Sequence, residues 1–344
     1  MNGVLIIDKP AGLTSHDVVN RARRILHERS VGHLGTLDPM ATGVLPLVTG
    51  SLTRLAQFYT KSEKIYEGTI RFGFATDTYD AEGEPTTAPQ DVCLNAKEVE
   101  ALVARFRGVI QQTPPPFSAK KIKGVPAYKL ARQQKEVVLQ PVQVEIKEFV
   151  ILAVEADRIR FRARVASGTY MRSVAHEMGR ELVCGAHLES LRRTSVAEFN
   201  LEDAHTLEQV AAAAQAMSPR LSTNPQRSPN TSPGGISENS PPVPLTDTRE
   251  SGDQRLGWTS EALEDFFVHP RKLLPQLPCV TADEATAARI RSGRTVNLPD
   301  LSRAHQVKVF ASQTDLIAIA TRVAGTLFHP KIVLTTAEDL TRRM

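Results

Sequence analysis

One stretch of the chain, Ser218 to Gly257, differs in composition from everything around it. Its 40 residues contain seven prolines, seven serines and four glycines, and no aromatic residue. Such a segment cannot bury enough apolar surface to offset the entropy lost on ordering, so we interpret it as a disordered linker. The sequence therefore predicts two domains, residues 1–217 and residues 258–344, joined by residues 218–257.

Composition narrows the class of protein. Apolar residues make up 41% of the 344 residues, which is enough for one large core and one small core. The formal charge of +4 weakly favours a polyanionic partner such as nucleic acid. The three cysteines are far apart with no CxxC spacing, so we expect neither disulfides nor a zinc site. No charged leader or long apolar run is present near the N-terminus, which favours a cytoplasmic protein that does not enter a membrane.

Apolar periodicity predicts alternating strands and helices in the large part. Val4–Ile7 is an apolar strand, and Thr14 or Ser15 can cap the helix that follows. Residues 64–74 alternate with period two, which places Tyr66, Gly68, Ile70 and Phe72 on one face of a strand. Four arginines share one face of another strand: Arg158, Arg160, Arg162 and Arg164. We interpret that face as solvated, with RNA binding as the alternative.

A strand-to-helix junction follows the arginine strand. Gly168 ends the strand and a helical apolar stripe begins at Met171, so Tyr170 and Arg172 lie at the junction, where functional side chains are common. The small part predicts a helix that ends at Gly293, then strands near 307–310, 316–323 and 332–334. It is thus a β-rich module, whereas periodicity alone leaves the larger domain open between α/β and α+β.

The segment from Gly32 to Gly50 is the most unusual in the chain. It combines closely spaced glycines and two prolines with His33 and Asp38, and glycine at this density is typical of backbone with positive φ or a close approach. In isolation, Asp38-Pro39 would be interpreted as a turn in which the carboxylate only bonds backbone.

Several other kinds of site are excluded by their motifs. The chain has no GxxxxGK[ST] or GxGxxG phosphate loop, no GxSxG serine elbow, and no second histidine after His176-Glu177 for a zincin helix. The acidic loop with Asp77, Asp80, Glu82 and Glu84 lacks calcium-loop spacing. We expect these four carboxylates to be solvated.

Five segments, in order, resemble the motifs of the TruB family of pseudouridine synthases. They are DKPAGLTSHDVV, GHLGTLDPMATGVLPL, KIYEGTIRFG, TPPPFSAKKIKGVPAYKLAR, and SGTYMRSVAHEMG followed by CGAHLESLRRTSVAEF. Together they extend over nearly all of residues 3–210. The chain from Leu274 onward resembles, less specifically, the PUA module that often follows this domain.

The resemblance implies a role for each matching residue. Asp38 would be the nucleophile that attacks a uridine or its ribose, and Arg172 would keep its carboxylate ionised. Tyr66 would stack on the flipped base and take part in proton transfer, with Tyr170 supporting it. His33 would fill the position that the base leaves. Leu191 would line the uracil pocket, Lys9 and Pro10 would support the wall of the site, and Lys120, Lys121 and Lys123 would clamp RNA phosphates or be merely solvated.

The resemblance also implies the fold and the partner. We expect an α+β fold with a mixed, largely antiparallel sheet, followed by a PUA-like module. The substrate would be tRNA, at the uridine at position 55 in the T-arm loop. No cofactor would be needed because the reaction is redox-neutral, and no metal is expected because no cluster of ligands has acceptable spacing. We expect a monomer without a protein partner. Two alternatives stay open: an RNA-binding protein without catalysis, and a uridine glycosylase that releases the base to water.

Overall fold

The computed structural model describes residues 2–118, 120–122, 124–133, 138–216, 261–299 and 304–334. The proposed linker 218–257 lies outside the described residues, as do Lys123 and the first residues of the predicted second domain.

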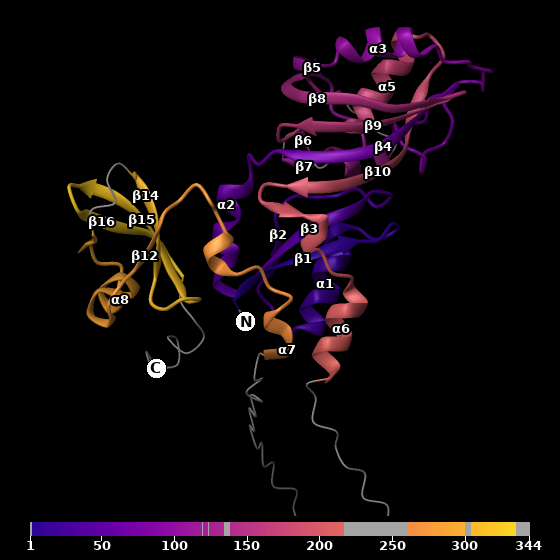
Figure 1. Ribbon diagram of the computed structural model, residues 1–344. Coiled ribbons are helices and arrows are strands. Elements are labelled where there is room, and N and C mark those ends of the chain that lie inside the picture. Colours follow the sequence, from indigo (N-terminus) through magenta and orange to yellow (C-terminus); the bar gives the residue numbers. More distant parts are fainter. Residues whose placement is uncertain are drawn as a thin grey trace, which may run out of the picture.

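A large sheet forms the centre of the first part of the chain (Figure 1). Its strands follow the order β1-β3-β10-β4-β9-β8-β5, with β2 paired to β3 and β11 to β10. Among these pairs only β10 with β3 is parallel. The mixed, largely antiparallel sheet confirms the α+β prediction. The strands are β1 (Gly3–Lys9), β2 (Val31–His33), β3 (Thr42–Thr49), β4 (Lys64–Phe72), β5 (Gly108–Gln112), β8 (Val142–Glu155), β9 (Arg158–Val165), β10 (Ala186–Val196) and β11 (Phe199–Asn200).

Helices cover one face of this sheet and bury its apolar side. Helix α1 (Ser15–Ile25) begins with a capping box between Thr14 and Asp17, one of the two caps predicted, and it buries Val18, Val19 and Ala22. The other helices are α2 (Ala56–Tyr59), α3 (Ala96–Ala104), α4 (Ala127–Arg132), α5 (Met171–Glu181) and α6 (Leu207–Ala216), with 3-10 turns at Gly50–Leu55 and Leu201–Asp203. Helices α1, α3, α5 and α6 contribute to one continuous core with β1, β4, β8 and β9. A short hairpin of β6 (Lys121–Ile122) and β7 (Val125–Pro126) precedes α4.

Strand β3 was not predicted from the sequence. Pro46 lies in its middle, and proline usually argues against a central strand because it cannot donate a ladder hydrogen bond. Here one edge of β3 pairs with β1, while the other pairs with β10 at residues 42–43 and with β2 at residues 47–49. Pro46 thus lies where the strand partner changes, so its missing N–H costs little.

The last part of the chain folds into a small sheet, as predicted. Its strands follow the order β12-β14-β15-β16-β13, and α8 packs against them before the chain turns at Gly293, which has φ +76°. The elements are β12 (Cys279–Thr281), α8 (Glu284–Arg291), β13 (Val296–Asn297), β14 (Gln306–Phe310), β15 (Leu316–Ala324) and β16 (Leu327–Val333), preceded by α7 (Glu261–Glu264) and a 3-10 turn at Pro270–Lys272. β12 and β13 were not predicted.

The two parts of the chain share an apolar cluster. Val4, Ile6 and Val48 of the large sheet pack in one cluster with Leu273, Phe310 and other residues of the last part. Glu198 joins the two parts as well: its carboxylate accepts hydrogen bonds from the Tyr59 hydroxyl at 2.6 Å and from the Leu274 amide at 2.9 Å. The small sheet is therefore docked on the face of β1 and β3 opposite α1.

Residues 261–268 pack against the first part of the chain. Helix α7 contacts α6, and the Val268 amide donates to the Val4 carbonyl at 2.8 Å. The two ends that residues 217–260 connect are thus close in space (Figure 1). No helix of the described residues is long and apolar enough to cross a membrane.

The shared cluster predicts that the small sheet stabilises the whole fold. Leu273 is fully buried in it, so Leu273→Ala should reduce the free energy of unfolding by about 2–5 kcal/mol through lost burial and the cavity left behind. Val323, exposed by 60%, offers the control: Val323→Ala should stay within about 0.5 kcal/mol. Equal melting temperatures for the two variants would contradict a docked module.

The contact of α6 with α7 predicts that a much shorter connection is tolerated. Removal of residues 222–251 should leave the melting temperature within about 2 °C, because the remaining chain can still span two neighbouring helix ends. Loss of soluble protein on this deletion would show that the segment is part of the fold.

Candidate active site

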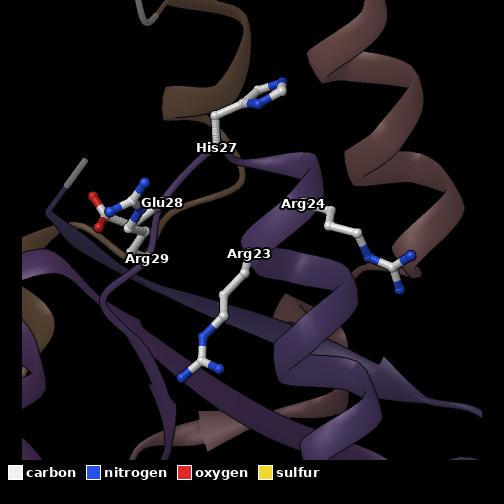
Figure 2. A pocket seen from close by; sticks show the side chains of 5 residues that line it. All are labelled: Arg23, Arg24, His27, Glu28 and Arg29. Atoms are coloured by element: carbon white, nitrogen blue, oxygen red, sulfur yellow. The ribbon is translucent and has the colours of Figure 1, made fainter.

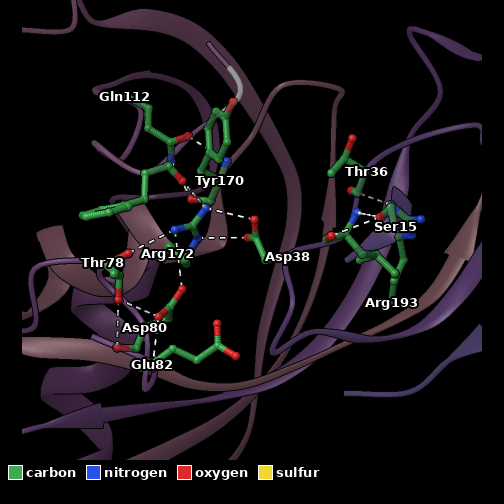
Figure 3. A network of polar contacts seen from close by, with 12 residues as sticks. Ser15, Thr36, Asp38, Thr78, Asp80, Glu82, Gln112, Tyr170, Arg172 and Arg193 are labelled. Carbon is green, nitrogen blue, oxygen red and sulfur yellow. Dashed lines mark hydrogen bonds and ion pairs between the residues drawn. The ribbon is translucent and has the colours of Figure 1, made fainter. Parts of the chain in front are cut away.

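The buried guanidinium of Arg172 lies at the centre of a polar network (Figure 3). Arg172 is the second residue of α5, and its side chain is 5% exposed. Nε lies 2.9 Å from Oδ2 of Asp38, and Nη2 donates to Oδ1 of Asp38 at 3.0 Å. Only the contact from Nη2 is a hydrogen bond, and the contact from Nε is a close ion pair without hydrogen-bond geometry. The Asp38 side chain itself is 35% exposed, so a reactant can reach it.

The other donors of Arg172 contact two further segments. Nη1 donates to the Thr78 carbonyl at 3.1 Å and lies 3.4 Å from Oδ2 of Asp80. Nη2 also donates to the Phe117 carbonyl at 3.0 Å. These acceptors offset part of the cost of removing a cation from water.

Asp80 corrects one expectation. The acidic loop was expected to be solvated, but the Asp80 side chain is only 5% exposed. Its Oδ1 accepts from the Thr78 hydroxyl at 2.6 Å and from the Glu82 amide at 3.1 Å. These local donors, together with Arg172, make burial of the carboxylate possible, and local sequence carries no signal for the distant arginine.

The loop that carries Asp38 is held on both sides of the aspartate. The Ser15 hydroxyl accepts from the Leu37 amide at 2.8 Å and donates to the Leu37 carbonyl at 3.1 Å. Lys9 is fully buried, and its Nζ donates to the Pro39 carbonyl at 3.0 Å and the Pro10 carbonyl at 2.8 Å. Burial lowers the pKa of Lys9 to about 8, although Glu82 and Asp38 oppose the shift. Lys9 therefore holds the loop that carries Asp38 through the Pro39 carbonyl.

Arg193 also holds this loop, and the sequence analysis missed it. It is fully buried, and it donates to the carbonyls of Gly35 at 3.0 Å, Thr36 at 3.3 Å and Val44 at 2.8 Å. Gly43 is required beside it, because a side-chain carbon there would lie 2.2 Å from the Arg193 carbonyl oxygen. The period-two alternation with Leu191 could have indicated that Arg193 faces inward.

Two of the candidate residues lie in the apolar core next to this network. Tyr66 on β4 and Leu191 on β10 are each 8% exposed, in the same cluster as Leu37 and Met171, the neighbours of Asp38 and Arg172 in the chain. Among the described residues, the Tyr66 hydroxyl has no hydrogen-bond partner. It is therefore able to bond a reactant.

Tyr170 lies near Asp38, and His33 lies near Arg193. Tyr170 precedes α5, and the buried Gln112 side chain accepts from its amide at 2.8 Å and donates to its carbonyl at 3.1 Å. Burial, with a further contribution from Asp38, raises the pKa of Tyr170. His33 ends β2, and its Nδ1 accepts from the Gly35 amide at 3.3 Å. Burial and Arg193 lower the pKa of His33, so its ring is neutral near pH 7.

The environment of Asp38 opposes its ionisation more than it favours it. Burial raises the pKa of Asp38 and Asp80 raises it further, whereas Arg172 and Lys9 lower it. The carboxylate is thus a stronger base than an ordinary aspartate while Arg172 still orients it. Such a group suits a nucleophile.

A hollow of about 460 Å³ lies at the C-terminal end of α1 (Figure 2). Its lining includes Arg23, Arg24, His27, Glu28 and Arg29. The guanidinium groups of Arg23 and Arg24 turn in different directions and donate to Asn20, and Arg23 also donates to the Val31 carbonyl. They do not converge on one ligand. Within the described part of the chain, no cluster of three His, Cys, Asp or Glu residues could hold a metal ion.

Comparison with known proteins places the chain in a family. It is 44% identical over 337 residues to the tRNA pseudouridine synthase B of Solibacter usitatus, a match that covers 97% of this chain and all of that protein. The chain belongs to the TruB family of pseudouridine synthases. The resemblance deduced from the motifs is thereby confirmed.

Further matches agree with the TruB family. The model described as "TruB family pseudouridylate synthase (N terminal domain)" matches residues 23–171, and "tRNA pseudouridylate synthase B C-terminal domain" matches residues 172–223. The tRNA pseudouridine synthase B of Burkholderia mallei is 34% identical, with 98% of each chain covered. A chain in "Crystal Structure of a Cbf5-Nop10-Gar1 Complex" has the same fold, with a TM-score of 0.63 at 22% identity over 98% of this chain and 86% of that one.

The structure predicts that the pKa values of Asp38 and Asp17 are shifted in opposite directions. Asp38, with its raised pKa, should take up its proton above the ordinary value of about 3.9 as the pH falls. Asp17 should do so below that value, because hydrogen bonds from Thr14 lower its pKa. NMR of the side-chain carboxyl carbons measures both midpoints, and the variants Asp38→Asn and Asp17→Asn assign the two signals. A midpoint for Asp38 at or below that of Asp17 would contradict the described environment. Arg172→Gln should raise the Asp38 midpoint further, since the opposing cation is removed.

Proposed function

We propose that this chain isomerises the uridine at position 55 in the T-arm loop of tRNA to pseudouridine, with Asp38 as a covalent nucleophile. The observation that carries the proposal is the accessible Asp38 carboxylate held by the buried Arg172 guanidinium. The names of the relatives support tRNA as the substrate class. Family membership and the site agree on the reaction.

Asp38 would act as follows. Ionised and oriented by Arg172, it attacks the target uridine or its ribose while the bond between the ribose and the base nitrogen breaks. The detached uracil rotates and rejoins the ribose through a ring carbon. That carbon loses its proton, the freed ring nitrogen gains one, and the bond to Asp38 is broken. Atoms and oxidation state are conserved overall, so no redox cofactor is needed.

The surrounding residues would receive a flipped base. A uridine stacked within a folded loop must leave the stack to reach Asp38. Tyr66 and Leu191 would contact the uracil from the apolar side, and the Tyr66 hydroxyl would be available for proton transfer. His33, neutral and half-buried, would occupy the vacated position in the loop, and Tyr170 and Lys9 would support the walls.

RNA contacts would extend beyond the reacting base. Lys120 and Lys121 are exposed next to the hairpin of β6 and β7, where they would contact phosphates. We further propose that the PUA-like sheet, docked on β1 and β3, is a separate domain that binds tRNA. The protein would act as a cytoplasmic monomer.

Substitution of the nucleophile tests the proposal. Asp38→Asn keeps the shape of the side chain but removes its charge, so single-turnover pseudouridine formation should fall by roughly a thousandfold or more. Binding of tRNA should stay within about tenfold, because phosphate contacts spread over many residues dominate affinity. Conversion at more than a few per cent of the wild-type rate would falsify the mechanism.

Asp17→Asn is the matched control. It changes an exposed aspartate at the cap of α1, so it should cost about 1 kcal/mol of stability and leave the rate unchanged. The product distinguishes the alternatives: free uracil would show a glycosylase, and unaltered uridine with bound tRNA would show an RNA-binding protein.

A further inference from the structure

Tyr79 occupies an unfavourable backbone conformation next to the polar network. Its φ is +66°, in the left-handed region that costs free energy for a residue with a bulky side chain. Its ring stacks on His176 with centroids 3.8 Å apart and planes 12° from parallel. Such a conformation persists only where the surroundings impose it.

Tyr79 lies between the two residues that contact Nη1 of Arg172. The Thr78 carbonyl accepts from this nitrogen, and the Asp80 carboxylate pairs with it. The backbone of Tyr79 is fixed on its other side as well, because the Leu188 amide donates to the Tyr79 carbonyl at 3.0 Å. The ring is therefore anchored in the centre of the loop that binds Arg172.

His176 lies one turn after Arg172 on the same face of α5, since residues four apart on a helix are neighbours. Loop 78–80 thus contacts α5 at two successive turns, by polar contacts at Arg172 and by stacked rings at His176. Among the described residues, Nδ1 of His176 is buried without a hydrogen-bond partner. The stacking contact with the Tyr79 ring therefore holds this imidazole in place.

We propose that the stack of Tyr79 on His176 is a positioning device for Arg172. It presses loop 78–80 against α5, so that Nη1 stays bonded and the edge formed by Nε and Nη2 stays turned toward Asp38. A guanidinium is planar, so loss of the Nη1 partners loosens the whole group, which only Asp38 and the Phe117 carbonyl would then hold. Neither Tyr79 nor His176 touches the reacting atoms; both act through Arg172.

The first test observes Arg172 directly and does not depend on activity. The guanidinium nitrogen signals of Arg172, assigned by NMR with Arg172→Lys, should be separate in the wild type and in Tyr79→Phe, which keeps the ring. In Tyr79→Leu they should average as the group begins to rotate. Phe74→Leu is the matched control, since Phe74 packs on His187 in a similar pair, 4.6 Å apart, with no contact to Arg172. The control should keep separate signals.

The second test measures the reaction and rests on the proposed function. With saturating tRNA, Tyr79→Leu should lower the single-turnover rate by about tenfold or more, while its affinity for tRNA stays within about threefold, because orientation of Asp38 is lost and phosphate contacts are not. Tyr79→Phe should restore the rate to within about twofold.

Two results would overturn the proposal. One is wild-type Arg172 signals in Tyr79→Leu; the other is equal averaging in Phe74→Leu, which would reveal a general loosening of the loop. If the wild-type protein forms no pseudouridine, the proposed function fails, and the Arg172 signals alone still decide the role of the stack.

Discussion

The burial of one guanidinium organises the catalytic half of this protein. A cation taken out of water is stable only when its donors are paired, and Arg172 finds its acceptors in Asp38, in loop 78–80 and in the Phe117 carbonyl. None of these acceptors lies on the helix that carries Arg172. The site therefore forms only when these loops pack around α5.

A different arrangement supports the loop beneath Asp38. Lys9 and Arg193 are fully buried cations whose hydrogen bonds go to backbone carbonyls, and neither forms an ion pair with a described carboxylate. These carbonyls fix the course of the loop and add no further carboxylate to Asp80, which already raises the pKa of Asp38. The carboxylate of Asp38 is held in place on one side and left accessible on the other.

The segment before Lys120 and Lys121 is attached to the same helix. Gln112 binds both backbone groups of Tyr170, and the Ser173 hydroxyl donates to the Thr113 carbonyl at 2.7 Å. Together with the Phe117 carbonyl, these contacts connect residues 112–117 to the first turn of α5. If the hairpin that begins at Lys121 moved on binding RNA, these contacts would transmit the movement to Arg172.

The sequence by itself determined several local elements and the family. The cap at Thr14, the alternation of the arginine strand and the helix that ends at Gly293 follow from local preferences, and the motif around Asp38 identified the family. Only the tertiary structure decided which charged groups are buried. From the sequence, Asp80 was expected to be solvated, and no prediction was made for Arg193 or Gln112. The partners of the last two lie far away in the chain: Gly35 is 158 residues from Arg193, and Tyr170 is 58 from Gln112. Whether a charge can be buried depends on donors and acceptors that folding brings together, and no local pattern records them.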